Sequence, residues 1–190
     1  MSTLGHGIRP SATLCGKLIE ARPPFPSDFE ALFEAASDPL IWVQHPERDR
    51  YTKPVFQKFF DSAIESKGAF ALIHAESGKI IGSSRYYGHD AEERASFGYD
   101  RNERAIFIGY TFIERAYWGR SFNLELKTMM LDHAFKYVDR VYFEIGANNL
   151  RSQIAIQRIG ARFFTRKQLP LFDGSMTDMV VFAIDGPQRT

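Results

Sequence analysis

The chain has 190 residues, of which 44% are hydrophobic and 25% are charged, a balance typical of one compact globular domain. Its formal net charge is +1, so no strong field attracts nucleic acid or an anionic membrane, and we expect neither as a partner. The single cysteine, Cys15, excludes a disulfide framework within the chain and favours a reducing, cytoplasmic compartment. No apolar run is long enough for a transmembrane helix.

Both ends of the chain differ in composition from its middle. Residues 1–16 contain Gly, Ser, Pro and His without a continuous apolar segment, which predicts a flexible arm and does not resemble a secretory signal. The tail at 186–190 has a similar loose character. Residues 17–185 contain no internal repeat and no low-complexity tract, so we expect a single domain over this range.

The first half of the chain alternates between strand and helix signals. It predicts, in order, a strand at Leu18–Ala21, a helix from Ser27 to Ala36, a second helix after Thr52, and strands at Ala69–Ala75 and Lys79–Tyr87. Ser27 and Thr52 are hydroxyl residues at positions where they can cap the two helices, and Pro54 suits the first turn of the second helix. Ser77-Gly78 is a hairpin signal between the last two strands.

The second half contains the most apolar strand and the longest helix. It predicts, in order, a central strand at Ala105–Ile113, a turn at Trp118–Asn123, a helix at Phe122–Val138, a strand at Val141–Ile145, a helix from Asn148 or Asn149 to Gly160, and strands at Ala161–Thr165 and Met176–Ile184. Lys127 falls among the apolar positions of the long helix, so we expect its amine to snorkel or to meet an acidic partner. Because a helix N-terminus presents unpaired amides and partial positive charge, the turn at 118–123 is the expected ligand site.

Three stretches carry a resemblance to a known family: Ile108–Phe112, Tyr117–Asn123, and Asn149–Ser152 running on to Ile159–Ala161. In their order and spacing they resemble the GNAT superfamily of N-acetyltransferases, and most of all the branch with the ribosomal-protein N-terminal alanine acetyltransferases. The resemblance covers roughly Leu18–Lys167. It implies an α+β (mixed α/β) three-layer fold, with a six- to seven-stranded, mostly antiparallel twisted sheet, a splayed parallel strand pair and about four helices. It also implies acetyl transfer to an amine by direct attack in a ternary complex.

The resemblance further implies that acetyl-CoA is the co-substrate and small-molecule partner. Its expected binding residues follow the central strand, the turn and the start of the next helix: Phe107, Ile108, Gly109, Tyr110, Thr111, Phe112, Trp118, Gly119, Arg120, Ser121, Phe122, Asn123, Asn149, Arg151 and Ser152. Two positions depart from the family pattern, because Ser121 stands where Gly is usual and Asn123 where Gly or Ala is usual. From the residues alone, a turn that only starts a helix, and a packing glycine at Gly109, are comparably good interpretations.

The expected catalytic residues are Ser152 and Glu114. A hydroxyl near the CoA sulfur can protonate the leaving thiolate, and Ser152 is the best replacement for the tyrosine that many family members have where this chain has Ile156. A role for Ser152 in the helix end alone is the alternative. The glutamate that the branch commonly uses as base is missing, which leaves Glu114, with His45 and Glu144 as alternatives.

The acceptor wall is expected from aromatic, cationic and hydroxyl residues in the first half of the chain: Trp42, His45, Tyr51, Arg85 and Tyr87. An aromatic cluster that only packs the core is the alternative interpretation. The histidines show no metal-ligand spacing, so we predict no metal site. The sequence does not identify the acceptor amine, and a homodimer is among the assemblies that it allows.

Two other classes of function compete with an active N-acetyltransferase. An acyl-CoA-binding regulatory or interaction module of the same fold would explain the missing tyrosine, the missing glutamate and the altered turn. An unrelated α+β interaction domain would bind no acyl-CoA at all. Binding of acetyl-CoA would exclude the unrelated interaction domain. Acetyl transfer to an amine would then distinguish an active enzyme from the regulatory or interaction module.

Overall fold

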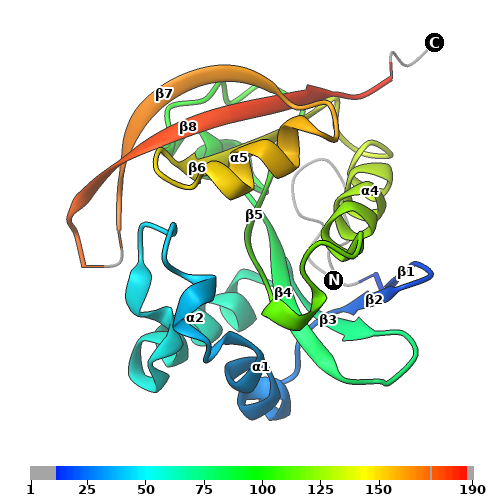
Figure 1. Cartoon of the computed structure of the whole chain (residues 1–190). Coiled ribbons are helices and arrows are strands. Elements are labelled where there is room, and N and C mark those ends of the chain that lie inside the picture. The colour runs from blue at the N-terminus through cyan, green and yellow to red at the C-terminus, as the bar shows by residue number, and fades with distance from the viewer. Residues whose placement is uncertain (1–11, 172, 188–190) are drawn as a thin grey trace.

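Eight strands form one mixed sheet in the computed structural model, which describes residues 12–171 and 173–187 (Figure 1). Neighbouring strands are antiparallel except for β5 and β6, which are parallel. The spatial order is β1-β2-β3-β4-β5-β6-β8-β7. The strands are β1 (Leu14–Cys15), β2 (Ile19–Arg22), β3 (Ala69–His74), β4 (Ile80–Tyr87), β5 (Ala105–Ile113), β6 (Arg140–Gly146), β7 (Arg162–Pro170) and β8 (Met176–Asp185).

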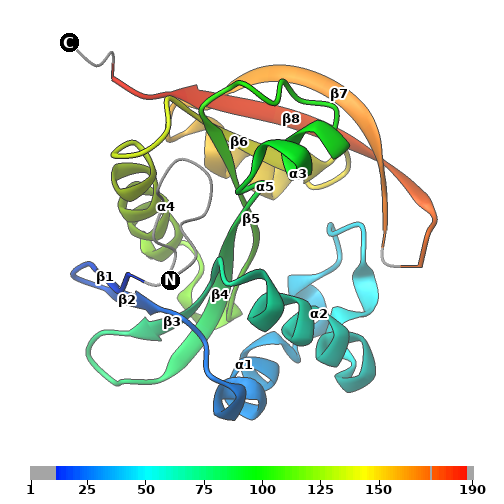
Figure 2. The ribbon, with the colours of Figure 1, turned by 180° about the vertical axis from the view of Figure 1, so that it is seen from behind.

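Five α-helices connect these strands: α1 (Phe29–Ala36), α2 (Lys53–Ser66), α3 (Ala91–Ser96), α4 (Phe122–Ala134) and α5 (Leu150–Gln157). Both views place α1 and α2 at one end of the molecule and β7 with β8 at the other (Figures 1 and 2). Helix α4 packs beside β1 and β2, and α5 packs on β6. Short 3₁₀ turns lie at 26–28, 39–41, 48–51 and 115–117.

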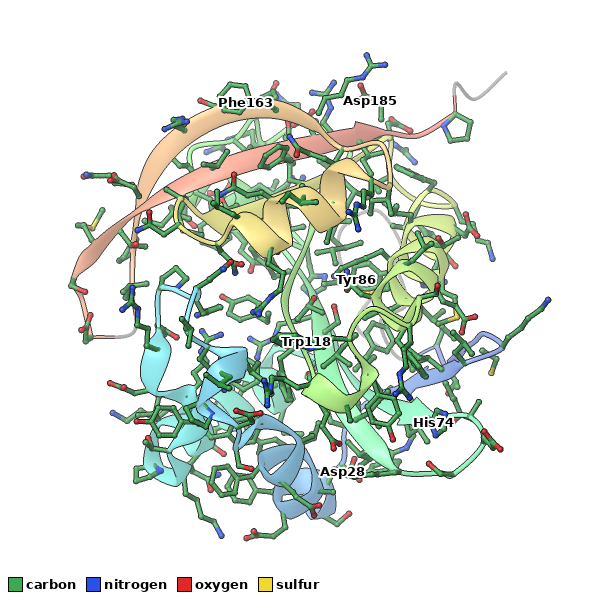
Figure 3. The ribbon with its side chains drawn as sticks, in the orientation of Figure 1. Asp28, His74, Tyr86, Trp118, Phe163 and Asp185 are labelled. Carbon is green, nitrogen blue, oxygen red and sulfur yellow. The ribbon has the colours of Figure 1, made fainter. Side chains whose placement is uncertain are left out.

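Apolar side chains cover both faces of the sheet, which gives the fold its three layers. One cluster joins the strands to α4, and in it the Tyr86 hydroxyl donates to the backbone carbonyl of Met130 at 2.6 Å. A second cluster joins α1 and α2 to the sheet through Trp42, Phe56 and their aromatic neighbours. Trp118 packs against both clusters and lies near the centre of the molecule (Figure 3). The two clusters therefore meet at Trp118, in the turn that leads into α4.

The expected fold is confirmed: the sheet is mostly antiparallel, and its parallel pair, β5 and β6, diverges after a short paired region. The sheet has one strand more than expected, because Leu14–Cys15 pairs with β2 as β1 inside the expected arm. Residues 1–11 of that arm and 188–190 of the expected tail lie outside the described residues. Among the helices that the structure describes, none combines the length and apolar character needed to cross a bilayer.

The expected caps of the first two helices differ from the structure, because other local hydrogen bonds form in their place. Ser27 does not cap α1. The Asp28 carboxylate instead accepts the backbone N–H of Phe25 at 2.7 Å and pairs with Arg22 at 2.7 Å. Thr52 is at the N-cap position of α2, but its hydroxyl donates to the Asp49 carbonyl and caps nothing.

The structure also shortens one expected helix and adds another. Helix α4 ends at Ala134, four residues before the expected end, and the chain continues through turns to β6. The segment between β4 and β5, where no helix was expected, contains α3, whose N-cap Asp90 accepts the Glu93 backbone N–H at 2.7 Å. These differences leave the strand, turn and helix of the expected ligand site in place.

Candidate active site

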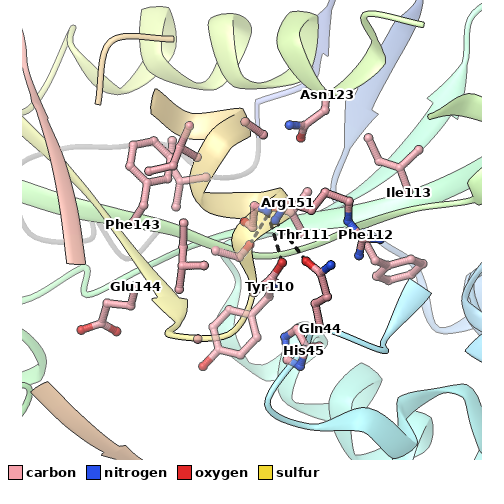
Figure 4. A pocket seen from close by; sticks show the side chains of 18 of the residues that line it. Gln44, His45, Tyr110, Thr111, Phe112, Ile113, Asn123, Phe143, Glu144 and Arg151 are labelled. Carbon is pink, nitrogen blue, oxygen red and sulfur yellow. Dashed lines mark hydrogen bonds between the residues drawn. The ribbon is translucent and has the colours of Figure 1, made fainter. Parts of the chain in front are cut away.

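The two parallel strands separate after three paired residues and leave a gap between them. Ala105–Phe107 of β5 pairs with Arg140–Tyr142 of β6, and the two strands pair no further along their length. A cavity of about 1050 Å³ opens in this gap. Its walls come from β5, β6, the first turns of α4 and α5, and the segment at 41–50 (Figure 4). Its volume is at the upper end of the range for small-molecule sites.

A β-bulge in β5 faces this cavity. Ser83 pairs with Phe112 and Arg85 with Gly109, so Tyr110 and Thr111 of β5 oppose one residue of β4. Tyr110 has a φ of 53°, a left-handed conformation that is uncommon outside glycine. The bulge therefore takes backbone groups of β5 out of the regular ladder at the point where the strand lines the cavity.

Gly109 precedes the bulge, and its neighbours explain why it is glycine. A Cβ at this position would lie 2.9 Å from the Tyr87 ring, closer than side chains tolerate. The packing interpretation of this glycine therefore has direct structural support. It is compatible with a ligand role, because Gly109 and Tyr87 both line the cavity.

The turn before α4 presents backbone amides to the cavity. Gly119 and Ser121 both have left-handed backbones, with φ values of 72° and 66°. Ser121 is the N-cap residue of α4, and its side chain makes no capping hydrogen bond. The first amides of a helix have no carbonyl partner within it, so those of Phe122, Asn123 and Leu124 remain available to a ligand. Because all three residues line the cavity, its α4 side suits an anion.

Helix α5, which follows β6, forms another wall of the cavity. Asn149 caps it as expected, with Oδ1 accepting the Ser152 backbone N–H at 3.2 Å. Ser152 lines the cavity, and its hydroxyl makes no side-chain hydrogen bond within the part of the chain that the structure describes. Ile156, one turn further along, also lines the wall.

Arg151 connects α5 to the segment at 41–50. Its backbone N–H donates to Gln44 Oε1 at 3.0 Å, and its guanidinium donates to the Ile41 carbonyl at 2.8 Å (Figure 4). The same guanidinium lies over the Trp118 ring. Arg151 was expected among the residues that bind acetyl-CoA, and in this structure it joins three walls of the cavity.

The end of the cavity away from α4 is aromatic and contains several ionisable groups. Trp42 is buried and stands edge-on to His45, at 5.4 Å between ring centroids. Partial burial and the Arg50 guanidinium hold the pKa of His45 well below its ordinary value. The His45 Nδ1 atom accepts the Glu47 backbone N–H at 3.0 Å, and Nε2 lies 3.3 Å from Arg50. Neither ring nitrogen therefore offers a lone pair to an incoming amine.

Glu144 of β6 is a carboxylate on the cavity wall, and three donors hold it. Tyr87 and Tyr99 each donate a hydroxyl at 3.0 Å, and the Lys167 ammonium lies at 2.5 Å. The Glu144 side chain is only 5% exposed. Proximity to this carboxylate and, above all, burial raise the pKa of Tyr87. Glu144 and Asn123 lie at opposite ends of the cavity (Figure 4).

Lys127 of α4 lies on the cavity wall against the bulge. Its side chain is buried, and its Nζ donates to Thr111 Oγ1 at 2.7 Å and to Ser84 Oγ at 3.4 Å. Burial alone lowers the pKa of Lys127 to about 7. The expected snorkelling or acidic partner is therefore wrong: the amine points inward, and its described partners are hydroxyls.

Most of the expected ligand residues line one cavity: Trp42, His45, Tyr87, Ile108, Gly109, Tyr110, Thr111, Phe112, Trp118, Gly119, Ser121, Phe122, Asn123, Asn149, Arg151 and Ser152. Four others do not line it. Phe107 is buried behind β5 between Tyr99 and Tyr142, and Arg120 and Tyr51 are exposed. Arg85 lies under the Tyr110 ring, 4.2 Å from its centroid.

Glu114, the expected base, also lies outside the cavity wall. Its carboxylate pairs with Lys79 at 2.9 Å. Sequence reasoning missed Arg50, Glu47 and Lys127 as site residues. A charged residue inside an aromatic segment was the available signal for Arg50, and a lysine among apolar helix positions was the signal for Lys127. No group of three or more metal-ligating side chains is assembled within residues 12–171 and 173–187.

Comparisons with known proteins agree with this geometry. A family model described as an acetyltransferase (GNAT) domain matches residues 19–162. A GCN5-related N-acetyltransferase from Brucella melitensis is similar in structure, with a TM-score of 0.72 and 21% identity over 92% of this chain and 79% of that one. The acetyltransferase (GNAT family) from Bacillus anthracis gives a TM-score of 0.71 and 17% identity over 92% and 98%.

A third solved structure contains ligands. It is a spermidine N-acetyltransferase from Vibrio cholerae in complex with CoA and spermine, with a TM-score of 0.63 and 14% identity over 90% of this chain and 96% of that one. At these identities, the solved structures establish a shared fold. A search of the curated proteins found no match.

Proposed function

The chain belongs to the acetyltransferase (GNAT) family, and on this premise we propose that it transfers an acetyl group from acetyl-CoA to the amine of a protein N-terminus or a small molecule. The observation that carries the proposal is a single cavity with the uncapped N-terminus of α4 on one side and an aromatic, carboxylate-containing end on the other. Such a cavity can hold both reactants at once, so the amine attacks the thioester directly in a ternary complex.

The helix α4 end is the proposed binding site for the CoA pyrophosphate. The amides of Phe122, Asn123 and Leu124 have no capping side chain, and two left-handed residues bring the preceding turn close to them. Backbone donors and the helix dipole favour a dianionic group without requiring a cationic side chain. Arg120 is exposed and its charge is largely solvated, which agrees with a site that relies on backbone amides.

The bulge in β5 is the proposed site for the reacting carbonyl. Backbone N–H groups that leave a ladder can donate to an oxygen that gains negative charge as the amine attacks. Tyr110 and Thr111 provide these groups on the cavity wall. The left-handed Tyr110 is strained, and its location at the reaction centre fits the tendency of such strain to collect at functional sites.

Glu144 is the proposed proton acceptor for the attacking amine. Its three donors fix the carboxylate in one orientation, and the Tyr87 hydroxyl connects it to the cavity. The amine proton then reaches Glu144 through Tyr87 or through water. His45 suits this role less well, because both of its ring nitrogens already face donors.

Ser152 is the proposed proton donor to the leaving CoA thiolate. Its backbone is fixed by Asn149, and its hydroxyl makes no other described side-chain hydrogen bond. A hydroxyl in this position can donate to sulfur as the carbon–sulfur bond breaks. Ile156, one turn further on, has no polar hydrogen to contribute.

Two measurements test the proposal. Calorimetric titration of the full chain with acetyl-CoA should give one site per chain, because the described residues form one cavity with the α4 helix end. A panel of amines (N-terminal peptides, polyamines and amino sugars) should then identify an acceptor through release of free CoA. Binding without transfer to any amine would instead support a regulatory or interaction module, and no binding at all would overturn the proposal.

A further inference from the structure

The amine of Lys127 is enclosed in the wall of the reaction cavity. The residue is 4% exposed, and Nζ reaches the two hydroxyls of Thr111 and Ser84 across the interface between α4 and the sheet. These hydroxyls are also hydrogen-bonded to each other at 2.8 Å. No carboxylate contacts Nζ among the residues that the structure describes.

This environment gives Lys127 the two properties that an acyl acceptor needs. Burial without a counter-ion disfavours the ammonium form, so a large fraction of the side chain is a free amine at neutral pH. Thr111 belongs to the bulge, so the free amine lies beside the strand segment that faces the cavity. A neutral lysine amine is a competent nucleophile toward a thioester.

We propose that Lys127 is an internal acetyl acceptor, so that bound acetyl-CoA acetylates the chain on Nζ of this residue. The inference rests on the proposed function, because it requires acetyl-CoA in the same cavity. The Nζ lone pair forms a bond to the thioester carbonyl carbon, and the carbon–sulfur bond breaks with its electron pair leaving on sulfur. One proton of the amine passes to the CoA thiolate, so the products are an acetyl-lysine and free CoA.

The site accommodates this product electrostatically. Acetylation converts an amine that must be either protonated or buried neutral into an amide that carries no charge. The amide N–H can keep the hydrogen bond to Thr111, since one hydrogen remains on the nitrogen. The cavity that Lys127 lines supplies room for the added acetyl group. The reaction therefore removes the cost of burying an ionisable group.

The test uses the full-length chain, incubated with acetyl-CoA in the absence of any amine acceptor. Intact-mass measurement should show one added acetyl group per chain, and peptide mapping should place it on Lys127. The rate should saturate with acetyl-CoA, as expected for a reaction within a complex. Acetyl groups found only on exposed lysines, or a rate at Lys127 equal to that of the urea-unfolded chain, would refute the proposal.

Two variants sharpen the assignment. Lys127→Met keeps a long apolar side chain and should abolish the saturable acetylation. Lys136→Met removes an exposed lysine from the turn that follows the same helix and should leave the acetylation of Lys127 unchanged. Mapping on the parent chain decides the question even where Lys127→Met does not fold.

The same samples separate this inference from the proposed function. A chain that binds acetyl-CoA and acetylates an external amine but leaves Lys127 unmodified refutes the inference alone. A chain that gives no heat with acetyl-CoA refutes both. Saturable acetylation of Lys127 supports the inference and also establishes that the thioester reacts within this cavity.

Discussion

The guanidinium carbon of Arg151 lies 4.0 Å from the ring centroid of Trp118. Trp118 lies in the turn before α4, and Arg151 lies in the first turn of α5. Their stacking therefore joins these two segments. Arg151 also donates to the Ile41 carbonyl at 2.8 Å, which extends the connection to the segment at 41–50. This contact fixes the relative positions of three cavity walls, and it gives the first prediction.

Arg151→Ala should weaken acetyl-CoA binding about fivefold, because it removes a cation–π contact and a charged hydrogen bond that together contribute about 1 kcal/mol. The loss should persist at high salt, since neither partner is a phosphate. Titration calorimetry at low and high salt measures it. Arg120→Ala is the matched control and should give a smaller effect that salt removes. A salt-sensitive loss for Arg151→Ala would instead indicate direct contact with phosphate.

Ser121→Gly should preserve or improve affinity for acetyl-CoA and raise stability by up to about 1 kcal/mol, because Ser121 has a left-handed backbone that glycine adopts without strain. Gly119→Val should abolish binding, since a branched residue resists the left-handed conformation found at that position. Dissociation constants and thermal unfolding of both variants test this. A folded Gly119→Val chain that binds like the parent would remove the turn from the phosphate site.

Glu144→Gln should lower kcat about 100-fold or more while leaving the dissociation constant of acetyl-CoA unchanged, because the amide cannot take the amine proton. The measurement is steady-state kinetics with an acceptor identified from the amine panel. Glu114→Gln is the matched control, since its carboxylate pairs with Lys79 outside the cavity wall, and its kcat should stay near that of the parent. The reverse pattern would assign the base to Glu114.

Ser152→Ala should lower kcat about tenfold or more with little change in acetyl-CoA affinity, because only the proton donor to the thiolate is lost. The cap of α5 should survive, since Asn149 bonds the backbone N–H of residue 152 and not its hydroxyl. Melting temperature therefore separates the two roles. An unchanged kcat with a lower melting temperature would leave Ser152 a structural role only.

Lys127→Met should stabilise the chain most at pH values up to about 7, where the full cost of burying the amine is present in the parent. Burial lowers the folded-state pKa of Lys127 to about 7, below the unfolded value of 10.5, so between these limits the unfolded chain binds more protons. The stability of the parent then rises with pH by up to about 1.4 kcal/mol per unit across that window. The advantage of the methionine variant should therefore shrink between about pH 7 and about pH 9.5. Thermal unfolding of the parent and the variant at these two pH values measures the change in that advantage. A difference in stability that does not depend on pH would contradict the buried neutral amine.

The fold was predictable where local pattern and tertiary context agree. The strand β5 was predicted to the residue, because a central strand buried on both faces is a continuous apolar run between polar loops. Helix α3 was not predicted, because it is short and polar. It is held by Arg94, which is buried and donates to the Gly88 and Arg101 carbonyls at 3.1 Å. Contacts of this kind have no signature in the local sequence.

The candidate site was predictable to the level of its backbone. The turn at 118–123 and the Asn149 cap follow from residue types at helix starts. Glu144 could not be distinguished from Glu114, because what separates them is their position in the fold. Each carboxylate pairs with a lysine, but β6 places Glu144 on the cavity wall and Glu114 lies outside it. The inward direction of Lys127 depends on a bulge in another element, which puts Thr111 opposite it.

The hydrogen bond between the Arg151 backbone and Gln44 Oε1 joins residues 107 positions apart in the chain. The site is therefore assembled from segments that are distant in the sequence. It is complete only when the whole domain is folded, so we expect ligand release not to follow from local unfolding of one segment. Saturating acetyl-CoA should therefore slow amide hydrogen exchange in β5, α4 and α5 together, and also in the segment at 41–50, by a common factor set by ligand concentration over its dissociation constant. Occupancy of the cavity would then stabilise the whole chain, and the supply of the thioester would set how long the protein survives proteolysis.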